Sequence, residues 1–215
     1  MTERFEPKLE VLPPAQRRVW DLLGSVPEPF VLYGGTAVAL YLGHRQSVDF
    51  DFFSQQAFDP AALRTSLAWM DHGAILQQAP STLTVLVDQG GPVRVSFFGL
   101  PNLRRLRAPL EAAESRIQVA SLLDLAGTKV ELVQRRAEEK DYIDIDAILV
   151  DGRVTLPMAL AAAVGIHGSR FNPQISLKAL SYFGDGTLPQ LAAPIRQRLL
   201  TAVRKVDLDR LPKVL

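Results

Sequence analysis

Residues 30–53 of the chain read FVLYGGTAVALYLGHRQSVDFDFF. The apolar run over 30–33 predicts a short strand. Two glycines follow it, and the apolar residues over 36–42 then predict an amphipathic helix. A second strand is predicted over 48–53, where apolar and acidic residues alternate. The stretch therefore predicts a strand, a glycine turn, a helix and a second strand in direct succession.

The glycine turn consists of Gly34 and Gly35, with Thr36 after them. Because glycine has no Cβ, the backbone there can turn tightly and a ligand can approach its N–H groups closely. The start of the following helix adds free N–H donors and the positive end of the helix dipole, which suits a phosphate. Thr36 would either cap this helix or present its hydroxyl to that phosphate. A simple reversal of the chain would use the same glycines, so the motif alone leaves both interpretations open.

The second strand carries Asp49, fourteen residues after Gly35, and Asp51. Side chains alternate along a strand, so the two carboxylates share one face. Neighbouring carboxylates repel each other unless a cation or solvent lies between them. Mg²⁺ prefers carboxylate and phosphate oxygens, so the pair beside a phosphate-binding turn predicts a Mg²⁺ or Mn²⁺ site. A solvated strand face is the alternative for the pair taken alone.

A helix predicted over 119–133 places Lys129 within or beside its apolar stripe. A lysine on a buried face must reach water along its own stem or find an anion. A bound triphosphate or the pair Asp49 and Asp51 would supply that anion. A lysine stem lying along the core, with its amine in water, is the alternative.

A later acidic stretch contains Asp141 and Asp144, which are three residues apart and therefore neighbours on one helix face. Acidic residues also favour the first turn of a helix, which is the alternative explanation for this pair. Tyr142 is predicted to be a core residue because it repeats at helical spacing with other apolar residues. Asp146 is predicted to be a solvated charge.

Strands cluster in the first half of the chain and helices dominate the second, which predicts an α+β head over 1–110 and a helical domain over 111–215. The 215 residues include no cysteine, which excludes disulfides, Cys-ligated zinc and thiol nucleophiles. The net charge of +1 neither favours nor excludes a polyanionic partner. We find no signal-peptide pattern and no apolar run of the ~20 residues that span a bilayer, so we expect a cytoplasmic protein with no membrane partner.

The stretches 33–40 and 42–53 resemble the AbiEii/AbiGii-type nucleotidyltransferases, a family of the polymerase-β-like superfamily that includes bacterial toxins. Lys129 is similar to the family's helical lysine, and Asp141 with Asp144 is similar to its later Asp-x-x-Asp. The resemblance runs from about residue 30 to residue 149. It implies a polymerase-β-like head with a small mixed sheet, followed by a helical C-terminal domain that contributes Lys129 and Asp141 to the cleft.

The resemblance also implies an enzyme that moves a nucleoside monophosphate from a nucleoside triphosphate to an acceptor and releases pyrophosphate. In this scheme Asp49 and Asp51 would hold Mg²⁺ or Mn²⁺. Contacts to the triphosphate are implied for Gly34, Gly35, Thr36 and Arg45, and Lys129 would bind phosphates or help to position the nucleotide. Packing against the strand is the alternative for Arg45. Asp141 would be a base or an additional acidic group, with Asp144 supporting it.

The family implies RNA, possibly tRNA in size, as the acceptor, and a toxin–antitoxin or phage-defence setting with an antitoxin protein as partner. Three basic clusters would contact an RNA backbone: Arg104, Arg105 and Arg107; Arg135 and Arg136; and Arg196, Arg198, Arg204 and Lys205. A solvated helix face is the alternative for each cluster. Two other functions stay open: transfer to a protein or small molecule, and a non-catalytic member that binds a nucleotide or a partner. Ser96, on a strand predicted over 93–98, keeps the non-catalytic function open. The superfamily often places a third carboxylate on the corresponding strand, and this strand has none.

Overall fold

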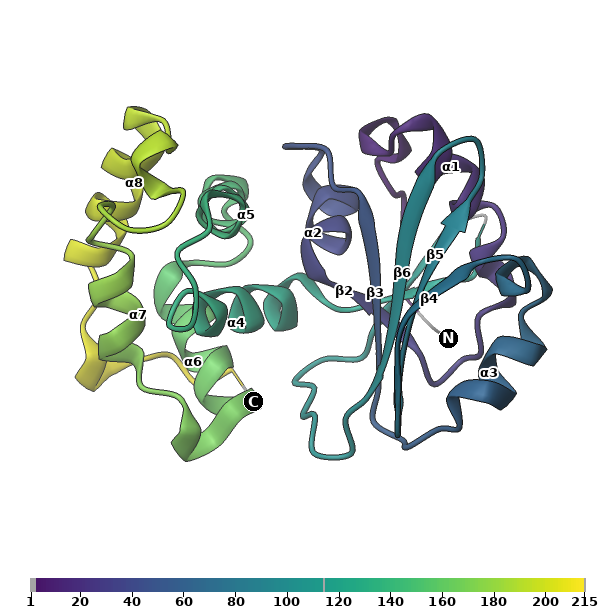
Figure 1. Ribbon diagram of the computed structural model, residues 1–215. Helices are drawn as coiled ribbons and strands as arrows, with labels where there is room; N and C mark the ends of the chain where they lie inside the picture. The colour runs from purple at the N-terminus through teal and green to yellow at the C-terminus, as the bar shows by residue number, and fades with distance from the viewer. Residues whose placement is uncertain (1–2, 114, 215) are drawn as a thin grey trace. The chain divides into compact units, whose positions relative to one another are not determined.

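The computed structural model describes residues 3–113 and 115–214, which form two compact units. The first unit runs to Leu103 and again from Ala108 to Ala120. The second unit comprises Arg104–Arg107 and the chain from Ser121 onward. Figure 1 shows a sheet flanked by helices in the first unit and a purely helical second unit.

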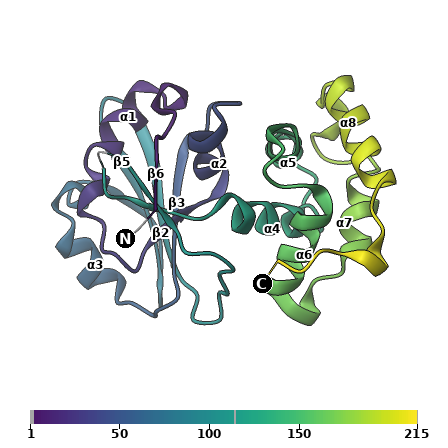
Figure 2. The ribbon, with the colours of Figure 1, turned by 180° about the vertical axis from the view of Figure 1, so that it is seen from behind.

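All strands of the described residues belong to the first unit: β1 (Arg4–Phe5), β2 (Val31–Tyr33), β3 (Asp49–Ser54), β4 (Ala74–Ala79), β5 (Thr82–Asp88), β6 (Pro92–Gly99), β7 (Leu110–Ala112) and β8 (Gln118–Val119). They form one mixed sheet in the order β1-β7-β8-β2-β3-β6-β5-β4. Its helices are α1 (Pro14–Trp20), α2 (Gly34–Leu42) and α3 (Pro60–Ser66), with short 3₁₀ turns at Leu9–Val11, Leu23–Ser25 and Ala68–Met70. Helix α2 covers one face of the sheet, and α1 and α3 cover the other (Figure 2).

Strand β3 has an apolar face that is completely buried. The ring centroids of Phe50 and Trp20 of α1 lie 6.3 Å apart, and Phe52 stacks on Phe97 of β6 with 5.2 Å between the ring centroids. Alternation along the strand therefore turns Asp49 and Asp51 toward the opposite face, which α2 covers. The predicted strands and helix of residues 30–53 are all present, with ends shifted by one or two residues.

The predicted boundary between the two parts is wrong by ten residues. Strands β7 and β8 extend the sheet, because β7 pairs with β1 and β8 pairs with β2, so the first unit continues to Ala120. Residues 104–107 belong instead to the second unit, where the Asp124 carboxylate accepts hydrogen bonds from the backbone N–H groups of Leu106 at 2.8 Å and Arg107 at 3.2 Å. Strands of two or three residues carry too little periodicity to be predicted from sequence.

The second unit contains the helices α4 (Leu122–Leu132), α5 (Glu139–Asp151), α6 (Leu156–His167), α7 (Pro173–Ala179) and α8 (Ala193–Arg204), with 3₁₀ turns at Gly168–Arg170, Leu188–Gln190 and Leu208–Arg210. Helices α4 and α6 approach closely at Gly127, where a Cβ would lie 3.0 Å from the Cβ of Ala162. Tyr142 is buried and donates its hydroxyl to the Ala179 carbonyl at 3.1 Å, which confirms the prediction that it is a core residue.

Among the described residues, no single helix is long and apolar enough to cross a membrane. The one helix pair that meets the length and hydropathy criteria together, α5 with α6 and its following turn, is bent by 119°.

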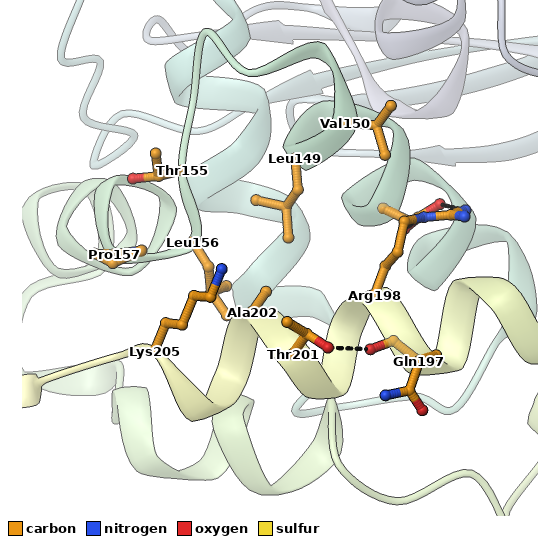
Figure 3. A pocket seen from close by; sticks show the side chains of 11 residues that line it. Leu149, Val150, Thr155, Leu156, Pro157, Gln197, Arg198, Thr201, Ala202 and Lys205 are labelled. Atoms are coloured by element: carbon orange, nitrogen blue, oxygen red, sulfur yellow. Dashed lines mark hydrogen bonds and ion pairs between the residues drawn. The ribbon is translucent and has the colours of Figure 1, made fainter.

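A largely apolar groove of about 540 Å³ lies between α5, the start of α6 and α8 (Figure 3). One wall includes an ion pair in which Arg198 donates to both carboxylate oxygens of Asp146, at 2.8 and 2.5 Å. Asp146 is buried, so the prediction that it is a solvated charge is wrong. The residues lining this groove include none of the predicted catalytic or nucleotide-binding residues.

Candidate active site

The glycine turn lies directly against two charged side chains. Gly34 has a left-handed backbone, with φ of +76°, and a Cβ on it would lie 2.8 Å from the Asp51 Oδ2 atom. A Cβ on Gly35 would collide with the guanidinium group of Arg45. The position of Gly34 therefore requires glycine, because its backbone is left-handed and a carboxylate from β3 approaches it. At Gly35 the guanidinium of Arg45, from the α2–β3 connection, would have to move to admit a Cβ. A turn that only reverses the chain would not need a charged side chain so close to its backbone.

Thr36 joins α2 to β3. Its side chain is buried, and its hydroxyl donates to the backbone carbonyl of Asp49. The side-chain amide Nε2 of Gln16, on α1, donates to both the Thr36 hydroxyl and the same carbonyl, at 3.4 Å in each case. The hydroxyl therefore neither caps α2 nor points toward a ligand, and a triphosphate contact by Thr36 is left to its backbone N–H group. The side chain instead fixes the start of the strand that carries the two carboxylates.

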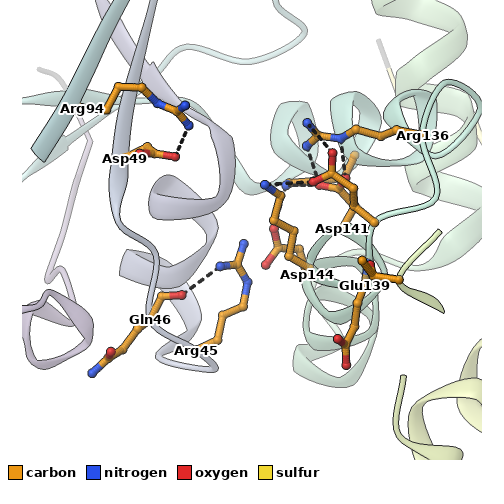
Figure 4. A network of polar contacts seen from close by, with 12 residues as sticks. Arg45, Gln46, Asp49, Arg94, Arg136, Glu139, Asp141 and Asp144 are labelled. Atoms are coloured by element: carbon orange, nitrogen blue, oxygen red, sulfur yellow. Dashed lines mark hydrogen bonds and ion pairs between the residues drawn. The ribbon is translucent and has the colours of Figure 1, made fainter. Parts of the chain in front are cut away.

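The carboxylate pair of β3 lies beside β6 in a defined register. Asp49 is paired with Arg94, and Asp51 is paired with Ser96. The Arg94 guanidinium forms an ion pair with the Asp49 carboxylate (Figure 4). The Asp49 side chain is 27% exposed and the Arg94 side chain 49% exposed, so this pair is open to solvent. Strand β6 thus places a cation and a hydroxyl, but no third carboxylate, beside the pair.

This donor set suits Mg²⁺ bound together with a substrate. Across the described residues, no group of three or more His, Cys, Asp and Glu side chains could hold a metal by itself. Mg²⁺ in proteins is commonly held by one or two carboxylates and completed by substrate phosphates and water. Asp49 and Asp51 supply such a pair, and the amides of Gly34 and Gly35 next to Asp51 offer donors for phosphates.

A second charged cluster lies within the helical unit. The Lys129 ammonium of α4 lies 2.8 Å from Asp141 Oδ1 and 2.7 Å from Asp144 Oδ2, both on α5. Arg136 donates from Nε to Asp141 Oδ2 at 2.7 Å and from Nη2 to Oδ1 at 3.1 Å (Figure 4). Both aspartates are completely buried and Lys129 is nearly so. Lys129 is therefore the buried cation of the cluster, and Arg136, whose side chain is 37% exposed, adds a second positive charge from the surface side, so that the buried carboxylates are paired as buried charges require.

Asp141 is poorly suited to act as a base. Burial alone would raise its pKa, but the hydrogen bonds and charges of Arg136 and Lys129 outweigh burial and hold the pKa below its ordinary value. Both of its oxygens also accept hydrogen bonds from these cations. A carboxylate in this state stays ionised and has little tendency to take a proton. The arrangement favours a role in positioning Lys129 over the predicted role as base.

The sequence indicated Lys129 and the pair of Asp141 and Asp144 as separate candidates, but it did not predict that they contact one another. The anion predicted for Lys129 was a triphosphate or the β3 carboxylates, whereas its partners within the helical unit are Asp141 and Asp144. Arg136 was predicted as one of the basic side chains that would contact RNA, and not as a partner of Asp141. The available signal was its place five residues before Asp141, between two helices.

The basic side chains predicted to contact RNA differ in whether they already make hydrogen bonds or ion pairs within the protein. Arg104 and Arg107 are exposed on the segment 104–107, which belongs to the second unit. Arg196 donates to the backbone carbonyls of Leu188, Pro189 and Leu191, and Arg198 is paired with Asp146. Two cations of the C-terminal cluster therefore serve the structure of the helical unit.

Comparisons with known proteins agree with this fold. The chain is similar to MenT4, a nucleotidyltransferase toxin from Mycobacterium tuberculosis H37Rv, with a TM-score of 0.57 and 15% identity over 89% of this chain and 84% of that one. A candidate nucleotidyltransferase from H. pylori gives a TM-score of 0.51 and 13% identity over 87% of this chain and 90% of that one. These likenesses confirm the predicted α+β fold of the polymerase-β-like type.

Sequence comparison identifies a relative and a family. An uncharacterized protein of Aquifex aeolicus (strain VF5) is 31% identical over 118 residues, which are 54% of this chain and 55% of the relative. The chain thus spans about half the length of this curated relative. Residues 22–212 match the family described as "Nucleotidyl transferase AbiEii toxin, Type IV TA system". Since this match covers most of the chain, the chain belongs to the AbiEii nucleotidyl transferase toxin family, as its glycine turn and carboxylate pair predicted.

Proposed function

We propose that this protein is a metal-dependent nucleotidyltransferase that moves a nucleoside monophosphate from a nucleoside triphosphate to RNA. We further propose that it acts in the cytoplasm as a toxin with a neutralising antitoxin. The observation that carries the proposal is the contact between Gly34 and Asp51, because it brings a phosphate-binding turn and a metal-binding carboxylate together. The family supports the reaction class, and MenT4 is itself a nucleotidyltransferase toxin.

In this proposal, Asp49 and Asp51 hold Mg²⁺ or Mn²⁺. A metal bound there supplies neutralisation of charge on the transferring phosphate and orientation of the attacking hydroxyl. The backbone amides of Gly34, Gly35 and Thr36 hold the triphosphate. Arg45, whose guanidinium lies over Gly35, adds a cation with donors suited to phosphate. The acceptor oxygen bonds to the α-phosphorus while the bond from that phosphorus to the bridging oxygen of pyrophosphate breaks. The proton of the acceptor hydroxyl passes to solvent, and pyrophosphate leaves.

Lys129 and its partners have a separate part in the proposal. Asp141 and Asp144 hold the Lys129 ammonium in place in the interior of the helical unit through two ion pairs. Asp141 is therefore a positioning residue that acts through Lys129. A contact between Lys129 and the nucleotide phosphates stays a prediction from the family resemblance.

A transfer assay tests the reaction and its acceptor together. The purified protein is incubated with Mg²⁺, total bacterial RNA and each α-labelled nucleoside triphosphate in turn. We expect label in tRNA-sized RNA with the unmodified protein and none with Asp49→Ala. Asp71→Ala is the matched control, because Asp71 is an exposed carboxylate of the same unit outside the site. Transfer retained by Asp49→Ala would contradict the proposed site.

Two other outcomes of the assay would redirect the proposal. Label on protein would support a protein-modifying enzyme and contradict an RNA acceptor. Nucleotide binding without any label would support the non-catalytic alternative. That alternative has one specific observation in its favour, which is the presence of Ser96 and Arg94, and no acid, beside the carboxylate pair.

The basic segment of the second unit gives a prediction about RNA binding. Replacing Arg104, Arg105 and Arg107 with alanine should weaken RNA binding and flatten its salt dependence, because fewer counterions are released. For three lost contacts to a single strand, the slope of log K against log salt should decrease by about 2. Binding measured over a series of salt concentrations checks this, with Arg4, Arg17 and Arg210→Ala as a control of equal charge. An unchanged slope in the first variant would remove the segment from the proposed RNA interface.

A further inference from the structure

One charged side chain at the β3–β6 pair has no role in the function proposed above. Arg94 lies on β6 in register with Asp49, and its guanidinium is paired with the Asp49 carboxylate. Ser96, two residues along β6, is in register with Asp51. Side chains two apart on a strand share a face, so the four residues form one group of two carboxylates, one guanidinium and one hydroxyl. Its formal charge is −1, half that of the two carboxylates alone.

The Arg94–Asp49 pair competes with a metal for the same carboxylate. A divalent cation on Asp49 would lie close to the guanidinium, and two like charges at that distance repel. Because both side chains are partly exposed, the pair itself contributes little stability and is easily exchanged. The arrangement therefore weakens metal binding in the absence of a nucleotide without preventing it.

The same guanidinium is well placed for a phosphate. It lies within hydrogen-bond reach of a carboxylate that would hold the metal, and the metal in turn would contact the nucleotide phosphates. Arginine presents a planar fork of donors that matches phosphate oxygens as well as carboxylate oxygens. A phosphate group brought to the site by a nucleotide would thus offer Arg94 a new anion while releasing Asp49 to the metal.

We propose that Arg94 is a nucleotide-binding residue that exchanges Asp49 for the phosphates of the incoming triphosphate, and so makes metal and nucleotide binding mutually dependent. This inference rests on the proposed function, since it assumes that Asp49 and Asp51 hold the metal. It assigns Arg94 two effects of opposite sign. The residue weakens binding of the metal alone and strengthens binding of the nucleotide–metal complex.

The test measures Mn²⁺ binding without turnover, by titration followed with electron paramagnetic resonance. We expect Arg94→Gln to bind Mn²⁺ alone more tightly than the unmodified protein, by about fivefold or more. Addition of a non-hydrolysable nucleoside triphosphate analogue should increase Mn²⁺ affinity strongly in the unmodified protein and only weakly in the variant. Arg94→Lys keeps the charge but loses the fork, so its affinity for Mn²⁺ alone should stay near the original while its affinity for the analogue falls.

Two further variants make each outcome decisive. Arg17→Gln breaks an exposed ion pair with Asp21 in the same unit and should leave both affinities unchanged. Asp49→Asn should abolish Mn²⁺ binding, which shows that the binding measured in the other variants takes place at this site. If Asp49→Asn abolishes binding but Arg94→Gln matches the unmodified protein in both titrations, the role of Arg94 is wrong and the proposed metal site stands. If no Mn²⁺ binding depends on Asp49, the metal site fails and the exchange fails with it.

Discussion

Replacing Lys129 with methionine should lower the free energy of unfolding by about 3–5 kcal/mol, one of the two largest effects that we expect from a single substitution. Methionine keeps much of the volume of the lysine stem, so packing on α4 is largely retained. The loss comes from the charge, because Asp141 and Asp144 are completely buried and lose the ammonium that both of them contact. Denaturant unfolding followed by far-ultraviolet circular dichroism, which reports on the helices, measures this change.

Two other variants separate this charge effect from a general effect of the substitution. Lys140→Met removes an exposed lysine that pairs with Glu138 on the surface, and should change the unfolding free energy by less than about 1 kcal/mol. A triple variant, Lys129→Met with Asp141→Asn and Asp144→Asn, removes charges of both signs and should recover part of the lost stability. A Lys129→Met protein as stable as the original would show that the buried cluster does not hold the helical unit together.

Asp51→Asn should reduce nucleotide transfer by about a thousandfold. A catalytic metal supplies several kcal/mol of transition-state stabilisation, and each 1.36 kcal/mol corresponds to a factor of ten in rate. Asparagine keeps the shape that fits against Gly34 but removes the negative charge that the metal needs. Initial rates at saturating nucleotide and varied Mg²⁺ concentration measure the loss, and excess Mg²⁺ should restore little of it.

The matched control for this variant is Asp71→Asn, which makes the same chemical change at an exposed position of the same unit. Its transfer rate should equal that of the unmodified protein. An Asp51→Asn protein that keeps more than about a tenth of the original rate would contradict the assignment of Asp51 as a metal ligand, since a lost ligand costs more than one factor of ten.

Much of the first unit could be predicted because its signals are local. The alternation that turns Asp49 and Asp51 away from Phe50 and Phe52 is a property of one strand, and neighbouring residues suffice to reveal it. The glycine turn is equally local, since Gly34 and Gly35 stand between a strand and a helix. The short strands β1, β7 and β8 gave no such signal, and this is why the boundary between the units was placed ten residues too early.

For the site residues as well, local features could be predicted from sequence and contacts between distant residues could not. Lys129 was recognised because a charge at helical spacing among apolar residues is visible in sequence, and Asp141 with Asp144 because carboxylates three residues apart share one helix face. That they would bind one another was not visible, since twelve or more residues separate the lysine from its partners. Their pairing depends on how α4 packs against α5, and that packing is set by the burial of both apolar faces at once.

The local pattern of residues 30–53 was sufficient to predict the strands, the turn and the shared face of the two aspartates, and, together with Lys129, Asp141 and Asp144, the resemblance to the family. The identity of each charged partner came from the folded chain: Arg94 for Asp49, Asp141 for Lys129 and Arg198 for Asp146. The physical reason is the range of the forces involved. Strand alternation and helix periodicity act over a few residues, whereas sheet register and helix packing join residues that lie twelve to fifty-two positions apart.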